Sequence, residues 1–145
     1  MTNTVTIACI LNTTDPTAKL GFEAWVDDQR FVDIDHVEKL ENILLEIPET
    51  DGDHKLKFIL KNKKESHTKI NAAGNIVSDA VLTISDIKFE DIALGHAFTE
   101  LAVYTHDFNG TQELADAKFY GEMGCNGTVS IDFSTPVYLW LLENM

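Results

Sequence analysis

The sequence of 145 residues is poor in cysteine and in basic side chains, and each scarcity excludes a class of protein. With only Cys9 and Cys125, nothing demands a disulfide, and their positions suit no metal motif. The 11 Lys and Arg against 24 Asp and Glu give a net charge of −13, which repels nucleic acid and anionic membranes. No apolar run approaches a membrane span, and the N-terminus lacks the features of a signal peptide. We therefore expect no nucleic-acid or membrane partner, and synthesis in a cytoplasm.

Motifs of catalysis and cofactor binding are missing as well. No P-loop, nucleophile elbow, zinc-protease motif or dinucleotide fingerprint occurs. The five histidines contain no pair at metal-ligand spacing, and His54, which opens a strand after a turn, is expected to be exposed to solvent. Asp51-Gly52-Asp53 begins like an EF-hand loop, but the later glycine and glutamate of that loop are absent. We expect a protein without enzymatic activity and without a cofactor.

The sequence does contain a period-two alternation of apolar residues, which is typical of strands with one buried face. The segments with this alternation are residues 4–11, 20–26, 55–61, 80–86 and 129–133. Residues 40–47 are less regular, and we interpret them as a strand that ends at a proline. One helix at most is expected, over residues 111–118. The pattern predicts an all-β, antiparallel, jelly-roll-like β-sandwich in a single domain spanning residues 1–145.

The C-terminal run VYLWLLENM, residues 137–145, is almost continuously apolar up to its last three residues. Leaving this surface in water is unfavourable by ~25 cal/mol per Å2. We therefore expect Trp140 and the neighbouring leucines to be buried, either in the core or in a contact between subunits.

Positive charge is concentrated between residues 55 and 69, which hold six of the basic residues against one acid. The alternation in DGDHKLKFILKNK turns the apolar side chains towards the core and the lysines to the opposite face. Two interpretations remain open. The lysines block unwanted pairing at a sheet edge, or a patch at Lys61, Lys63 and Lys64 docks on the acidic surface of a partner or of another copy.

Aromatic residues and glycines are combined in residues 105–110 and 118–128. One interpretation is a loop in which Phe108 and Tyr120 form a platform for a sugar or a peptide. The alternative is a loop shaped by its glycines, whose aromatic side chains cover the end of the core or seal a subunit contact.

Residues 20–87 carry a resemblance in three pieces: LGFEAWVDDQRFV, IPETDGDHKLKFILKN and NIVSDAVLTISDI. In order and spacing they resemble the calcium-dependent carbohydrate-binding modules of the xylan-binding kind. The resemblance implies a β-sandwich, and it points to Asn62 and Asp79 as candidates for a calcium site. In that family an acid follows the asparagine, whereas here Lys63 and Lys64 do. Because ammonium groups oppose a divalent ion, we expect no metal.

Two longer pieces, KNKKESHTKINAAGNIVSDA and HDFNG with KFYGEMGCNGTVSIDFSTPVYLWLLENM, resemble virion-associated proteins of marine tailed phages, cyanophages included. This resemblance implies a non-enzymatic structural or interaction protein of a phage particle (capsid, neck, tail or baseplate), located in the virion. Its partners would be other virion proteins or copies of itself. The alternative function is a calcium-dependent module that recognises a cell-surface glycan.

Overall fold

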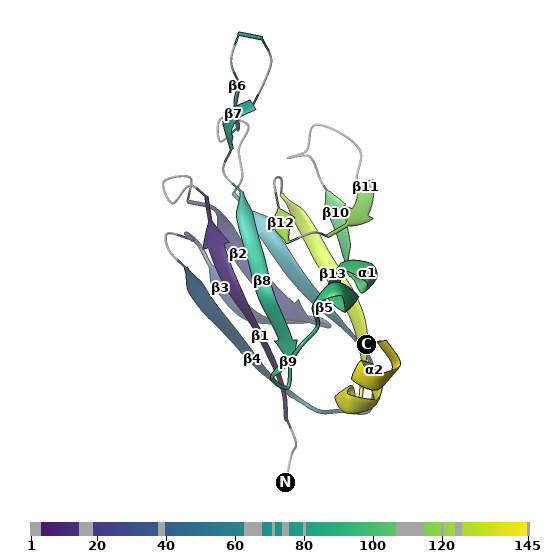
Figure 1. Ribbon diagram of the computed structural model, residues 1–145. Helices are drawn as coiled ribbons and strands as arrows, with labels where there is room; N and C mark the ends of the chain where they lie inside the picture. The colour runs from purple at the N-terminus through teal and green to yellow at the C-terminus, as the bar shows by residue number, and fades with distance from the viewer. Residues whose placement is uncertain are drawn as a thin grey trace.

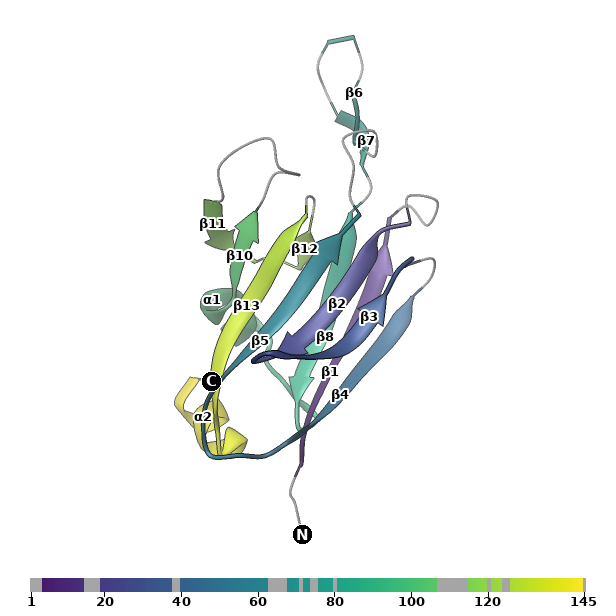
Figure 2. The ribbon, with the colours of Figure 1, turned by 180° about the vertical axis from the view of Figure 1, so that it is seen from behind.

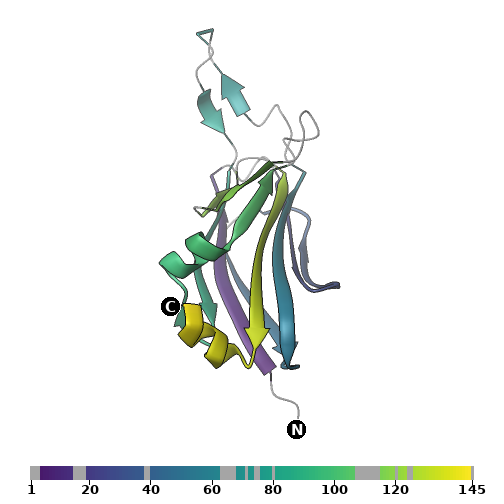
Figure 3. The same ribbon diagram turned by 90° about the vertical axis from the view of Figure 1, so that its right-hand side faces the viewer.

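The protein folds into two antiparallel β-sheets stacked face to face, as the computed structural model shows edge-on in Figure 3. The structure describes residues 4–14, 19–37, 40–62, 68–70, 72–73, 76–79, 81–106, 115–119, 121–123 and 126–144. Every strand pair in this part of the chain is antiparallel. The predicted antiparallel β-sandwich is therefore confirmed.

The first sheet, here called the β8 sheet, faces the viewer in Figure 1. Its order is β12 (Glu122–Met123), β8 (Leu82–Phe89), β1 (Thr4–Thr13) and β4 (Glu41–Pro48), with β9 (Ile92–Ala93) also beside β8. The second sheet, the β5 sheet, faces the viewer in Figure 2. Its order is β11 (Ala115–Lys118), β10 (Val103–His106), β13 (Gly127–Thr135), β5 (Gly52–Lys61), β2 (Gly21–Val26) and β3 (Gln29–Ile34). The chain crosses repeatedly between the two sheets, because β1 and β4 belong to one and β2, β3 and β5 to the other.

The core lies between the sheets and consists of the inward half of each alternating strand. In β5 the buried side chains are Leu56, Phe58 and Leu60, as the period-two pattern predicts. Burying this apolar surface drives folding by roughly 25 cal/mol per Å2. Aromatic rings join the layers, since the centroids of Phe89 in β8 and Phe133 in β13 are 5.2 Å apart.

Strand β8 contains an irregularity that the sequence pattern did not predict. Its buried residues change phase from Leu82 and Ile84 to Ile87 and Phe89. Asp86 between them has a φ of 52°, and the pairing of β8 with β1 shifts register at this point. One residue in the left-handed region thus keeps both halves of the strand facing the core.

Two short helices replace the single helix that was expected, and neither lies where the sequence predicted it. They are α1 (His96–Leu101) and α2 (Val137–Asn144), which lie along one side of the sandwich (Figure 3). The expected helix over residues 111–118 is wrong in its second half, where β11 pairs with β10. The first half, residues 111–114, lies outside the described residues. No helix in the described part of the chain is long and apolar enough to cross a membrane.

Helix α2 buries only part of the C-terminal apolar run. Trp140 and Leu141 are buried, which confirms the prediction for these two residues. Tyr138, Leu139 and Leu142 are 56%, 58% and 78% exposed in the single chain. The expectation of wholly buried leucines is therefore wrong for the core, because a helix on the surface turns only one face inward.

Strands β6 (Thr68–Ile70) and β7 (Ile76–Asp79) form a separate two-stranded sheet. This hairpin stands beyond the end of the sandwich in all three ribbon views (Figures 1–3). It follows β5 and precedes β8, so it connects the two sheets.

Candidate functional site

The outer face of the β5 sheet carries an aromatic side chain among polar ones. In β2, Phe22 and Ala24 are buried, whereas Glu23 and Trp25 alternate with them and turn outward, partly exposed. Trp25 lies opposite Arg30 of β3 and Lys57 of β5. Residues that are paired directly across an antiparallel sheet share a face. A row of outward side chains therefore crosses the sheet with Trp25 inside it.

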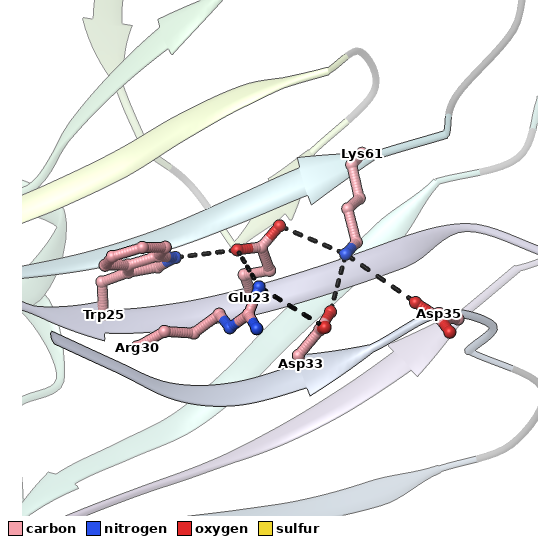
Figure 4. A network of polar contacts seen from close by, with 6 residues as sticks. All are labelled: Glu23, Trp25, Arg30, Asp33, Asp35 and Lys61. Atoms are coloured by element: carbon pink, nitrogen blue, oxygen red, sulfur yellow. Dashed lines mark hydrogen bonds and ion pairs between the residues drawn. The ribbon is translucent and has the colours of Figure 1, made fainter.

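Polar contacts fix the orientation of the Trp25 indole, as Figure 4 shows. Its Nε1–H donates to Glu23 Oε1 over 2.9 Å. Arg30 Nη1 lies 3.6 Å from the same carboxylate oxygen, and the Arg30 guanidinium carbon is 6.0 Å from the centroid of the indole ring. A ring held in this way loses little rotational freedom when a ligand covers it.

Lys61, at the end of β5, connects the network to strand β3. Its Nζ lies 3.2 Å from Glu23 Oε2, 2.6 Å from Asp33 Oδ1 and 3.9 Å from Asp35 Oδ1 (Figure 4). The path across β2 is open because Gly21 has no side chain. A Cβ at that position would be 2.6 Å from Lys61 Cγ. The glycine is thus what allows a β5 lysine to reach β3.

The pKa shifts follow from these contacts. The hydrogen bond to Asp33, and then that to Glu23, raises the pKa of Lys61 against the effect of burial. The indole hydrogen bond, and then Lys61, lowers the pKa of Glu23. The pKa of Asp33 is lowered mainly by its hydrogen bond to Lys61. Each shift favours the charged form, so the network is ionised at neutral pH.

A hollow of about 380 Å3 adjoins Lys61 on the same face. Its lining comprises two apolar residues, an ammonium group, two amides, two hydroxyls and a glycine: Ile59, Leu60, Lys61, Asn62, Asn126, Thr105, Thr128 and Gly127. A Cβ on Gly127 would collide with the carbonyl of Thr105, so the glycine lets β13 pack closely against β10 beside the hollow. Amides and hydroxyls beside an apolar floor suit a ligand rich in hydroxyl groups.

Of the partner-binding and ligand-binding residues predicted from the sequence, Lys61 is the one that the described part of the structure places on this face. Its charge is already matched by acids of the same chain. Lys63 and Lys64 lie outside the described residues, so their docking role stays a prediction. The same is true of Phe108 and Tyr120 as a ligand platform.

The candidate calcium residues lie on different segments of the chain, Asn62 just after β5 and Asp79 at the end of β7. Asn62 is exposed and has a φ of 68°, while Asp79 lies opposite Thr68. The side chain of Asp79 lies outside the described part. Among the residues that the structure describes, no group of three or more His, Cys, Asp or Glu side chains could hold a metal ion.

His54 at the other end of the sheet is not exposed as expected, since only 12% of its side chain is accessible. Its Nδ1 lies 2.8 Å from Asp27 Oδ2, and its Nε2 lies 2.8 Å from the Thr50 carbonyl and 3.3 Å from Thr135 Oγ1. Burial opposes the charge of the ring, but the hydrogen bonds to Asp27 and Thr50 outweigh it and raise the pKa of His54.

His54, Asp27 and Thr135 are the residue types of a hydrolase triad, but their hydrogen bonds are not those of a triad. The Thr135 hydroxyl donates to the Thr50 carbonyl, and Thr135 is 6% exposed. A nucleophile would instead give its proton to the imidazole and face the substrate. His54 therefore connects the β2–β3 turn to the β4–β5 turn, and the role is structural.

Trp25 is the residue that sequence reasoning missed. A signal was present, because the alternation of Leu20, Phe22, Ala24 and Val26 requires the residue at position 25 to face outward. The outward position of Trp25 could therefore have been predicted, although one apolar side chain on a surface does not by itself indicate a binding site.

Comparisons with known proteins identify the architecture. A scan against protein-family models finds no match, and a search of curated proteins finds none. Among solved structures, a vCBM60 in complex with galactobiose matches with a TM-score of 0.52 at 12% sequence identity, over 89% of this chain and 97% of that one. At this identity the likeness concerns the fold. The chain thus shares the β-sandwich fold of a carbohydrate-binding module.

Proposed function

We propose that the protein is a non-catalytic glycan-binding module that receives a sugar on the outer face of the β5 sheet. The observation that carries the proposal is Trp25, an outward indole fixed by Glu23 and placed among polar side chains. A pyranose ring has an apolar face of C–H groups and a rim of hydroxyls, so it packs on an indole while its rim bonds to polar neighbours. The hollow beside Lys61 extends the surface with amides and hydroxyls.

The fold likeness supports the proposal and supplies the first ligand to try. The similar structure is in complex with galactobiose, and its sandwich matches nearly all of this chain. Galactobiose and longer galacto-oligosaccharides are therefore the starting panel, followed by xylo-oligosaccharides, as the sequence resemblance suggests.

The test is calorimetric titration of the full chain with each oligosaccharide, repeated with Trp25→Ala. Losing an indole that covers roughly 60 Å2 of sugar should weaken binding about tenfold at 25 cal/mol per Å2. Tyr138→Ala is the matched control, because it removes an exposed aromatic ring from α2, away from this face. Its affinity should equal that of the wild type.

Two outcomes would move or remove the proposed site. If Trp25→Ala binds normally and Phe108→Ala or Tyr120→Ala does not, the ligand binds at the loops instead. If no oligosaccharide binds, neutral or acidic, with calcium or with a chelator present, the function itself is refuted. Binding that requires calcium and is lost in Asp79→Ala would support the metal-dependent form of the proposal.

A second candidate function is a structural or interaction subunit of a tailed phage particle. The observation that favours an interaction role is the exposed apolar face of α2, where Tyr138, Leu139 and Leu142 stand beside a groove of about 300 Å3 lined in part by Ile92. Contiguous exposed apolar surface is typical of contacts between proteins. Mass spectrometry of purified virions tests whether the protein is part of the particle. Absence of the protein from the virions would refute this second candidate function.

A further inference from the structure

The basic side chains on the outer face of the β5 sheet are matched by acids, with one exception. Arg30 pairs with Glu23 and Asp33, and Lys61 pairs with the same two acids and with Asp35. Lys55 and Lys118 at the margins pair with Asp132 and Glu100. Within the described part of the chain, the Lys57 side chain makes no direct hydrogen bond or ion pair, and its charge acts only from a distance on Asp27, whose pKa it lowers less than His54 and the Lys55 amide do.

Lys57 occupies a central place on this face. It lies on β5, one of the two middle strands of the sheet, directly opposite Trp25 on β2 and Ser130 on β13. Side chains that are paired in this way have Cβ atoms about 4.5–5.5 Å apart. A lysine stem is long enough to bring its ammonium group to the edge of any ring that covers the indole.

We propose that Lys57 makes this face selective for sugars that carry an anionic group, a ring carboxylate or a sulfate, over their neutral counterparts. The inference rests on the proposed glycan-binding function and names its ligand class. Trp25 would pack against the pyranose ring, and Lys57 would pair with the anionic substituent at the edge of that ring. An ammonium paired with an anion gives a charge-assisted hydrogen bond, which is stronger than a neutral one.

Solubility does not explain an unpaired lysine here. The chain has a net charge of −13, and a large net charge is what keeps a protein soluble, so each added cation reduces it. Protection against edge pairing does not explain it either, because β5 is flanked by β13 and β2. The same net charge disfavours long polyanions, so the preferred ligand is a short oligosaccharide with an isolated charge.

The experiment compares three ligands of equal length: a neutral galacto-oligosaccharide, a galacturonate oligosaccharide, and a galacto-oligosaccharide with one sulfate. Affinities are measured by calorimetry for the wild type, Lys57→Gln and Lys55→Gln. Lys55 is the matched control, because it lies on the same strand and face but is paired with Asp132. We expect the wild type to bind at least one anionic ligand about fivefold more tightly than the neutral one.

In Lys57→Gln the preference should disappear while the affinity for the neutral ligand stays the same, and Lys55→Gln should behave as the wild type. Which anionic ligand gains affinity tells carboxylate from sulfate. Equal wild-type affinity for neutral and anionic ligands, or a preference that persists in Lys57→Gln, would overturn the inference and leave glycan binding intact. Failure to bind any of the three ligands or any other glycan would instead refute the proposed function.

Discussion

The imidazole of His54 allows a stability prediction whose dependence on pH can be worked out. We consider His54→Phe, which keeps an aromatic ring against Phe133, whose centroid lies 5.3 Å from that of His54. The substitution removes the contacts of Nδ1 with Asp27 and of Nε2 with Thr50. Because packing is conserved, the change in the free energy of unfolding reports mainly on the polar contacts.

The groups left behind limit the cost of this substitution. Asp27 is 50% exposed and regains water, and the Thr50 carbonyl still accepts from the Thr135 hydroxyl. No buried polar atom therefore loses its last partner. We expect a loss of about 1–2 kcal/mol, the net value of one or two hydrogen bonds, towards the lower end because the Asp27 side of the contact is screened by solvent.

The sign of the pH effect follows from the direction of each shift. The folded pKa of His54 is raised above its ordinary value of 6.5, so its contribution is fully present below that pH and is lost as pH rises through the folded pKa. The hydrogen bond from His54, and then that from the Lys55 amide, lowers the pKa of Asp27 below 3.8. The Asp27 contribution is present above pH 3.8 and is lost as pH falls through the lowered value.

Urea unfolding, followed by tryptophan fluorescence, measures the effect at about pH 5.5 and about pH 9. The free energy of unfolding of the wild type should exceed that of His54→Phe by more at the lower pH than at the higher pH. Asp27→Asn supplies the second arm of a double-mutant cycle, because asparagine tolerates the φ of 54° and still accepts from the Lys55 amide. A coupling between the two substitutions that is the same at both pH values would refute an ionised His54–Asp27 pair.

Three further predictions concern packing. Gly21→Ala should displace the side chains of Lys61 and Asn62 and cost about 1–2 kcal/mol in urea unfolding, with a smaller additional cost when Lys61 is already alanine, because Asn62 Nδ2 would still lie 2.8 Å from the new Cβ. Burial raises the pKa of the Cys9 thiol to about 12, so alkylation of Cys9 at neutral pH, read on its own peptide by mass spectrometry, should require unfolding; fast labelling of Cys9 in the native protein would contradict this, whatever happens at Cys125. Trp140→Ala should destabilise by about 3–5 kcal/mol, and Leu142→Ala, at a site 78% exposed, by under about 0.5 kcal/mol; equal losses would argue against the observed orientation of α2.

Local alternation was sufficient to predict most of the sandwich. The strands β1, β2, β4, β5 and β13 lie within a few residues of their predicted bounds, because one face of each is apolar with a period of two, less regularly in β4 than in the others. In the turn between β2 and β3, Asp27 has the positive φ that a short acidic side chain tolerates.

The misassigned segments show where local patterns are insufficient. The buried residues of α2, Val137, Trp140 and Leu141, follow the i, i+3, i+4 spacing of a helix, but apolar residues at the intervening positions hide that period. The segment of β11 has helix-forming residues, yet pairing with β10 holds it extended. The position of His54 depends on Thr50 and Thr135, which only the folded chain brings together.

The Lys61 ammonium occupies the position that a bound cation would have among the carboxylates around it, but it cannot dissociate. Glu23, Asp33 and Asp35 converge on the Lys61 ammonium, as carboxylates do around a bound cation, but here the charge is tethered to the chain. A tethered group is present at high effective concentration whatever the solution contains. Chelators, competing metals and a low supply of divalent ions should therefore leave the outer face of the β5 sheet assembled, with Trp25 still held by Glu23.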